Sequence, residues 1–118
     1  NDDPRYHHYW TTYHSLTERR GVSPAVAKTL VRTNTTIIAA LMVYLGDADT
    51  LICGTIGRYI DHFRHLQQIL GVQPQLNQCA ALCAIVMDHK PLFICDPYLN
   101  IDPTAEQLVE MTLLSAQQ

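Results

Sequence analysis

Residues 46–64 read GDADTLICGTIGRYIDHFR, and this stretch decides the fold. Gly46 follows an apolar run and predicts the end of a helix, because glycine accepts left-handed backbone there. Leu51–Cys53 is a short apolar run between turn residues, which predicts a strand covered on both faces. Gly54 and Gly57 then allow sharp turns before a new helix. Ligands of open α/β sheets bind where the chain leaves a strand and enters a helix, so we expect a site here.

Before this stretch the sequence predicts three helices. Four aromatic residues recur at helical spacing: Tyr6, Tyr9, Trp10 and Tyr13. They predict either a surface helix whose aromatic face packs on the domain or an interface with another part of a longer protein. Ser23 and Pro24 predict the start of a second helix. Residues 32–36 interrupt it, and the third helix, 36–45, is apolar nearly all round and should be buried.

Beyond the stretch we expect a helix, a hairpin and a last helix. Ile60–Leu70 predicts a helix with Ile60, Phe63, Leu66 and Leu70 inward and Gly71 at its end. After a loop over residues 72–78, Cys79–Met87 predicts a buried strand, and a turn over residues 88–91 returns the chain through Leu92–Cys95 as an antiparallel partner. Thr104 and Gln107 match a capping box. The predicted inward side of that last helix comprises Leu108, Val109, Thr112 and Leu113.

Length, composition and charge indicate a small globular domain. The chain has 118 residues, 47% hydrophobic and 16% charged, which is enough for one small globular core. A net charge of −3 gives no electrostatic case for nucleic acid, and no apolar run approaches the ~18 residues of a membrane span. The four cysteines form no Cys-x-x-Cys pair and are expected reduced and buried in a cytoplasmic protein, with a reactive Cys53 thiol as the alternative. The chain begins at Asn1 without methionine and stops inside a predicted helix, so we expect a piece of a longer protein.

Three motifs together resemble the phosphotransacetylase (phosphate acetyltransferase) family: Met42–Asp49, Leu51–Thr55 and Asp102–Leu108. Gly54–Tyr59 looks most like the phosphotransacetylase-like C-terminal domain of large bacterial NADP-dependent malic enzymes. The resemblance runs from about Val22 to the end and less clearly from Asp3. It implies an α/β fragment of that domain, with a small mixed sheet, a β-hairpin and flanking helices. Residues 1–21 would be a peripheral aromatic helical segment and residues 22–118 the α/β core.

The family's transferases carry His-(Ser/Thr)-Thr-Ala-Asp-Thr-x-Arg-Pro at the positions of Gly57–His65. Only Asp61 and Arg64 agree with that pattern, and Gly57 and Tyr59 replace histidine and threonine. No catalytic residue is therefore expected here. Arginine suits bidentate contact with phosphate, and a helix N-terminus attracts anions. The expected acetyl-CoA or phosphate contacts are Arg58, Tyr59, Asp61, Arg64 and Thr104, against the alternatives of surface charge for the arginines and bound water at Thr104. His62 and His65 are expected to be solvated or hydrogen-bonded, with no partners placed for a metal.

We consider three functional hypotheses, of which the resemblance implies the first two. The first is a non-catalytic regulatory domain that senses acetyl-CoA and supports homo-oligomers, joined to the rest of a parent chain that decarboxylates malate to pyruvate with NADP and Mg or Mn. The second is part of an active phosphate acetyltransferase, whose remaining catalytic residues would lie beyond Gln118. The third is an interaction module without a ligand. For this fragment itself we expect no cofactor, with acetyl-CoA as its ligand, and no nucleic-acid or membrane partner.

Overall fold

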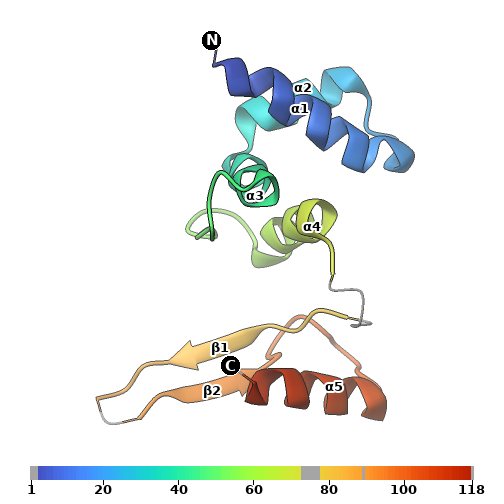
Figure 1. Ribbon diagram of the computed structural model, residues 1–118. Coiled ribbons are helices and arrows are strands. Elements are labelled where there is room, and N and C mark those ends of the chain that lie inside the picture. Colours follow the sequence, from blue (N-terminus) through green and yellow to red (C-terminus); the bar gives the residue numbers. More distant parts are fainter. Residues whose placement is uncertain (1–2, 73–77, 89, 118) are drawn as a thin grey trace. The chain divides into compact units, whose positions relative to one another are not determined.

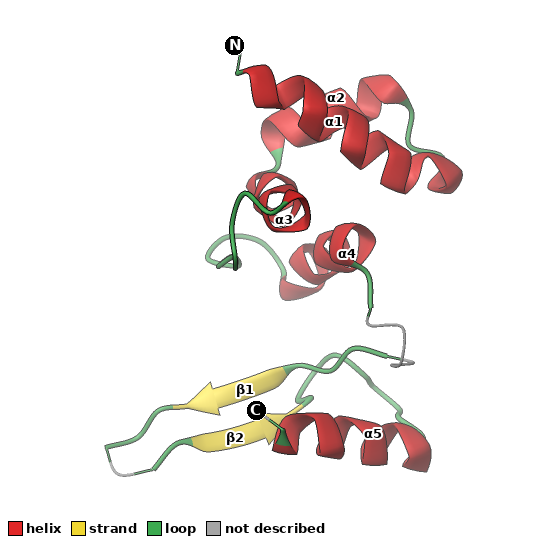
Figure 2. Ribbon diagram, in the orientation of Figure 1, coloured by secondary structure: helices red, strands yellow, loops and turns green. Residues whose placement is uncertain are grey.

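The computed structural model describes residues 3–72, 78–88 and 90–117. The α/β class and the helix-flanked hairpin are confirmed (Figures 1 and 2). Contacts divide the chain into two compact units, Asn1–Gly71 and Val72–Gln118. The predicted loop 72–78 and turn 88–91 fall partly outside the described residues, and the division into residues 1–21 and 22–118 stays a prediction. The described elements are α1 (Pro4–Thr17), η1 (Glu18–Arg20), α2 (Pro24–Thr33), α3 (Thr35–Leu45), α4 (Tyr59–Leu70), β1 (Leu82–Ile85), β2 (Leu92–Cys95) and α5 (Ala105–Ala116).

The ends of the helices in the first unit follow their local sequence signals. The Ser23 side chain accepts a hydrogen bond from the amide of Val26, and Pro24 opens α2. Asn34 ends α2, and its side-chain oxygen accepts hydrogen bonds from two backbone amides in the first turn of α3. The chain bends by 99° between the two helices. Gly46 closes α3 with a φ of 80°, as predicted.

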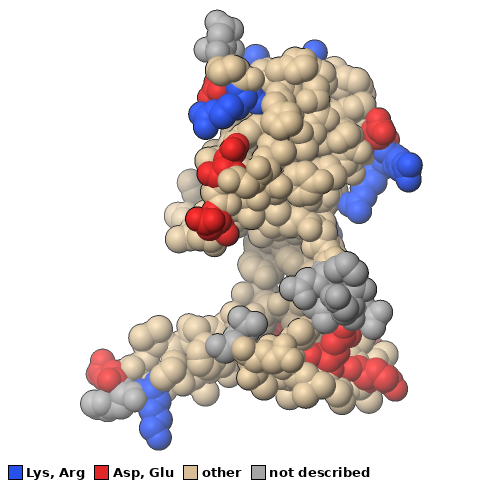
Figure 3. Space-filling view, in the orientation of Figure 1, with Lys and Arg blue, Asp and Glu red and all other residues tan. Residues whose placement is uncertain are grey.

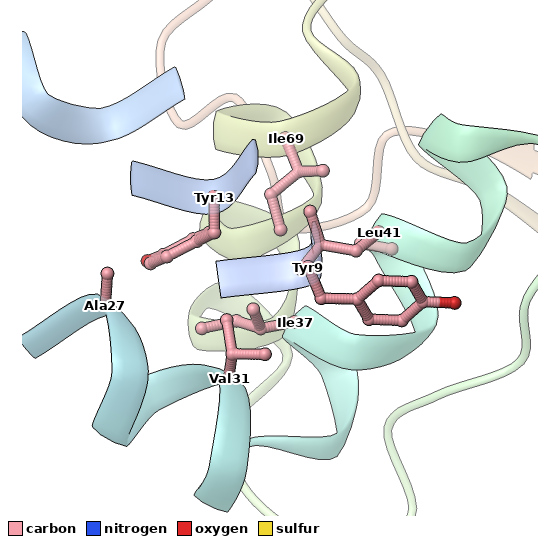
Figure 4. Close-up of a cluster of buried hydrophobic side chains, with 8 residues drawn as sticks. Tyr9, Tyr13, Ala27, Val31, Ile37, Leu41 and Ile69 are labelled. Carbon is pink, nitrogen blue, oxygen red and sulfur yellow. The ribbon is translucent and has the colours of Figure 1, made fainter. Parts of the chain in front are cut away.

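The core of the first unit joins all four helices (Figure 4). Tyr9 and Tyr13 enter it from α1, and their neighbours Tyr6 and Trp10 pack against its edge, which confirms the aromatic face. Burying one large apolar side chain stabilises a fold by about 1.5–3 kcal/mol, so each large member of this cluster contributes on that scale. Its members are Tyr9, Tyr13, Ala27, Val31, Ile37, Ala40, Leu41 and Ile69.

Two burial predictions for these helices are wrong. We expected α3 to be buried all round, but one face carries the buried residues and Tyr44 is 47% exposed. In α4 the fully buried residue is Ile69, whereas Leu70 is 42% exposed. The apolar pattern alone does not say which face of a helix meets the core when several apolar side chains share its circumference.

The predicted strand Leu51–Cys53 is also wrong. These residues lie in a loop, with Ile52 98% exposed and Cys53 exposed. A strand needs a neighbour for its backbone hydrogen bonds, and the sheet in the described residues contains only β1 and β2, paired antiparallel. The expected mixed sheet is therefore an antiparallel hairpin within the described part of the chain.

In the second unit α5 packs against β2. The hairpin register pairs Leu82 with Cys95 and Ile85 with Leu92, which confirms the predicted pairing. The burial predicted for the first strand is wrong, because Leu82 and Ile85 of β1 are 36% and 43% exposed. The inward side of α5 is likewise misassigned. Met111 is the buried residue, whereas the predicted Leu108, Val109, Thr112 and Leu113 are exposed.

The surface offers no extended charged area on the face drawn in Figure 3, where charged side chains gather in a few separate groups. No single helix within the described residues is long and apolar enough to cross a membrane. Taken together, α2 and α3 reach the length and composition of a span, but the bend at Asn34 separates them.

Candidate functional site

The loop between α3 and α4 makes two sharp turns where the sequence predicted them. Gly54 has a φ of 110° and Gly57 a φ of 102°, both in a region that side-chain-bearing residues rarely adopt. Arg58 is the N-cap residue of α4 and offers no side-chain acceptor to the helix amides. The loop thus delivers the chain directly into a helix N-terminus, where backbone amides favour an anion.

One carboxylate joins two arginines on the first turns of α4. Arg58 donates from Nε to Asp61 Oδ2 at 2.8 Å and from Nη2 to Oδ1 at 3.1 Å. Arg64 Nη1 lies 3.7 Å from Asp61 Oδ1. The Arg58 guanidinium, helped by Arg64, lowers the pKa of the Asp61 carboxyl. All three side chains are substantially exposed, so both guanidinium groups remain accessible to a second anion.

His62 holds the glycine loop onto α3. Its Nε2 lies 2.7 Å from the carbonyl oxygen of Ile56, which only accepts, so Nε2 carries a proton and donates. In the neutral ring, Nδ1 then accepts from the hydroxyl of Thr36 at 2.8 Å. A Cβ at Gly57 would lie only 3.1 Å from His62 Nε2, so the imidazole fills the space beside that glycine. These contacts confirm a hydrogen-bonded histidine, but its structural role was not predicted.

His65 connects α4 to the break between α2 and α3. Asn34 Nδ2 donates to His65 Nε2 at 3.1 Å, which requires that nitrogen to be unprotonated. Burial lowers the pKa of His65, while the nearby Asp61 carboxylate opposes that shift. The same Asn34 side chain caps α3, so one amide serves both the helix end and the histidine.

Two cavities flank the loop and share Cys53, Gly54 and His62 in their walls. One encloses about 350 Å³ and is completed by Gly57, Tyr59, Phe63 and Leu66. The other encloses about 340 Å³ against the N-terminal half of α3. The rings of Tyr59 and Phe63 stack with centroids 6.3 Å apart. These volumes lie within the usual range for small-molecule sites.

The structure brings together four of the five predicted contact residues. Arg58, Tyr59, Asp61 and Arg64 share the first turns of α4, whereas Thr104 caps α5 in the second unit. The Thr104 capping box is complete, with Gln107 reaching back to the Thr104 amide at 2.8 Å. The sequence did not predict that His62 forms the wall between the two cavities; the available signal was its position in the first turn of α4, five residues after Gly57. Residues 3–72, 78–88 and 90–117 hold no cluster of three His, Cys, Asp or Glu suited to a metal. The four cysteines are free, but Cys53 and Cys95 are exposed rather than buried.

Comparison with known proteins places this geometry in context. The family model described as phosphate acetyl/butaryl transferase matches residues 1–118. An NADP-dependent malic enzyme of Haemophilus influenzae is 41% identical over 99% of this chain and 16% of its own length. An NAD-dependent malic enzyme of Rhizobium meliloti is 41% identical over 98% of this chain and 15% of its own length. A phosphate acetyltransferase of Synechocystis sp. is 31% identical over 96% of this chain and 16% of its own length. The chain thus spans about a sixth of the length of the curated relatives it matches.

Proposed function

This chain belongs to the phosphate acetyl/butaryl transferase family, and we propose that it is part of a phosphotransacetylase-like regulatory domain of a malic enzyme. In this proposal the domain binds acetyl-CoA and supports assembly into homo-oligomers, but does not move acetyl groups. The parent chain would decarboxylate malate to pyruvate in the cytoplasm with NADP and Mg or Mn. The identities to malic enzymes support this context over nearly the whole chain.

The observation that carries the proposal is the pair of accessible arginines at an uncapped helix N-terminus beside a cavity. Arg58 and Arg64 converge on Asp61, and Tyr59 on the same turn lines the 350 Å³ cavity. Phosphates of CoA would meet the guanidinium groups and the α4 amides, and the thioester arm would have an apolar wall at Phe63 and Leu66.

The case against acetyl transfer rests on what replaces the transferases' motif. Gly57 stands where their histidine stands, and the space for a side chain there is taken by His62. Both ring nitrogens of His62 are already engaged, with Ile56 and Thr36. A histidine held by two hydrogen bonds within the protein is poorly placed to exchange protons with a substrate.

Regulation would follow from differential affinity. A ligand changes activity at a distant site only if it binds one conformational or oligomeric state more tightly than another. Acetyl-CoA that draws Arg58 away from Asp61 would alter how α4 and its loop are held. That change would be the local event behind any shift between oligomers.

Calorimetric titration of acetyl-CoA into the full-length protein tests this site. We expect Arg58→Ala to weaken binding by roughly tenfold or more, because a charge-assisted hydrogen bond contributes about 1.5–3 kcal/mol. Arg19→Ala, at an exposed arginine of η1, is the matched control and should leave binding unchanged. Equal affinity in the Arg58 variant would remove this helix terminus from the proposal.

The identity to the Synechocystis enzyme favours a second candidate, an active phosphate acetyltransferase. It predicts release of CoA from acetyl-CoA and phosphate at the usual enzymatic rates of ~1–1000 per second. The third candidate, an interaction module without ligand, predicts no change in thermal stability with acetyl-CoA. A ligand at ~100 times its dissociation constant would instead stabilise the fold by about 2.7 kcal/mol. One CoA-release assay and one melting series therefore separate all three.

A further inference from the structure

A groove between α1 and α2 has no part in the function proposed above. It encloses about 610 Å³, within the range of small-molecule sites. The Tyr6 hydroxyl donates to the carbonyl oxygen of Lys28 at 2.9 Å, which ties the two helices together along the groove. Its lining combines aromatic and cationic side chains with no acidic one: Tyr6, His7, Trp10, Lys28, Thr29 and Arg32.

Both cations of the groove rest on aromatic rings. Lys28 Nζ lies 4.4 Å from the centroid of the Trp10 ring, and Arg32 Cζ lies 5.3 Å from that of Tyr6. They are four residues apart on α2, so their charged heads share one helix face. No carboxylate in the described part of the chain lies within salt-bridge distance of either.

Among the described residues, this arrangement leaves the positive charges of Lys28 and Arg32 without a counter-charge. A hydrogen bond from Lys or Arg to phosphate is stronger than a cation–π contact at an exposed site, so a phosphate would draw both heads from their rings. Movement of Lys28 would uncover the face of Trp10 for a planar group. The His7 ring, 5.2 Å from Trp10 and inclined at 75°, closes one side of that platform.

We propose that the groove between α1 and α2 binds a nucleoside phosphate, with its phosphate between Lys28 and Arg32 and its base stacked on Trp10. The positive charges and the aromatic rings of the groove favour this class of ligand. Arginine and lysine recognise the anion, and aromatic side chains stack on bases irrespective of their identity. A free nucleotide and the nucleotide part of CoA share this chemistry. The inference does not depend on acetyl-CoA binding at α4.

Photolabelling of the full-length protein with 8-azido-ADP, followed by peptide mapping, tests the groove directly. We expect label on peptides of α1 and α2, displaced by unlabelled ADP. Lys28→Gln combined with Arg32→Gln should reduce that label roughly tenfold or more, because two charge-assisted contacts are lost. Trp10→Ala should reduce it as well. Arg19→Gln and Arg58→Ala are controls expected to retain it, with melting temperatures confirming that all variants fold.

Competition for the photolabel by unlabelled compounds shows which ligand the groove binds and can overturn the proposal. Displacement by acetyl-CoA as well as ADP would support the groove and identify CoA as a source, whereas displacement by ADP alone would support a free nucleotide. Absence of label on residues 4–33, or label there that is undiminished in the double variant, would overturn the proposal. So would displacement by poly-glutamate but not by ADP, since the groove would then recognise an acidic segment. The proposed function is tested separately, by the effect of Arg58→Ala on acetyl-CoA affinity. A negative photolabelling result would therefore count against the groove and not against the proposed function.

Discussion

His62 connects three parts of the first unit through one imidazole ring. It bonds to the Ile56 carbonyl in the loop and to the Thr36 hydroxyl on α3, while its own backbone belongs to α4. Both cavities of the candidate site include it in their walls. A side chain of this kind fixes the loop rather than reacting, which is why the site's geometry depends on it.

Asp61 should restrain the arginines that the proposed ligand needs. We expect Asp61→Asn to tighten acetyl-CoA binding several-fold, because it frees Arg58 and Arg64 and removes a negative charge beside the phosphate site. Isothermal titration at low and moderate salt measures this. Asp49→Asn, at an exposed aspartate of the same loop region, is the control. Weaker binding in Asp61→Asn would show that the aspartate serves the ligand instead.

His65 should make stability fall in mild acid. Its folded pKa lies below the ordinary 6.5 because of burial, so its contribution is complete above pH 6.5 and is lost as the pH falls through the folded pKa. In His65→Gln, which keeps an acceptor for Asn34, the decline in unfolding free energy between pH 6.5 and 5 should be smaller. Denaturant melts across that interval check it, with His8→Gln on the exposed side of α1 as control. An unchanged pH slope would contradict the assignment.

At the scale of elements, capping signals were predictable and strand neighbours were not. The caps at Ser23 and Thr104 and the stop at Gly46 involve residues within one turn, so the local sequence contains the whole interaction. Leu51–Cys53 looked like a strand because it is apolar and bounded by turns. A strand, however, requires a partner distant in the chain, and the pattern of a short run carries no information about it.

Asn34 is the joint between α2, α3 and α4, and its two roles can be separated. Asn34→Ala should cost about 1–2 kcal/mol in unfolding free energy, because the helix cap and the hydrogen bond to His65 are both lost. Asn34→Asp keeps the capping oxygen and should cost less at pH 7.5. It should also raise the pKa of His65, since a carboxylate favours the imidazolium. Chemical denaturation and histidine titration by NMR measure the two effects. Equal costs for the two variants would contradict a capping role.

At the scale of the whole molecule, the two units differ in how much they bury. The described core of the first unit contains eight buried hydrophobic residues, whereas Ala81 and Met111 are the buried hydrophobic residues described in the second. Phe93 and Leu113 of the second unit are 56% and 60% exposed. An isolated two-stranded hairpin is marginal in water, and in the described residues the support for this one is α5 and a small core.

Hydrogen exchange should reveal this difference. We expect backbone amides of β1 and β2 in the 118-residue chain to exchange at least about tenfold faster than those of α3, since each large side chain missing from a core forfeits about 1.5–3 kcal/mol. Mass spectrometry of peptides from the two units measures it. Met111→Ala should accelerate exchange in the second unit alone. Equal protection of both units would mean that they unfold as one.

The candidate site was predictable in part for the same reason as the helix caps. Arg58, Tyr59, Asp61 and Arg64 are close in sequence on one helix, so their proximity in space follows directly. Thr104 was grouped with them by chemistry alone, and the structure places it in a different unit. A hydrogen-bonded His62 was predicted, but its structural role was not, because that role depends on Thr36, twenty-six positions earlier, and on the adjoining Gly57.

Because Gly57 and His62 are in contact, the effect of a substitution at either position depends on the residue at the other. Introducing a histidine at position 57 would bring it against the imidazole of His62, on a backbone with a φ of 102°. The change would be harmful unless His62 had been lost first, and losing His62 first would loosen the loop. If the chain does not exchange acetyl groups, as proposed, a histidine at position 57 alone would therefore not supply that activity, because the side chains at positions 57 and 62 compete for one space.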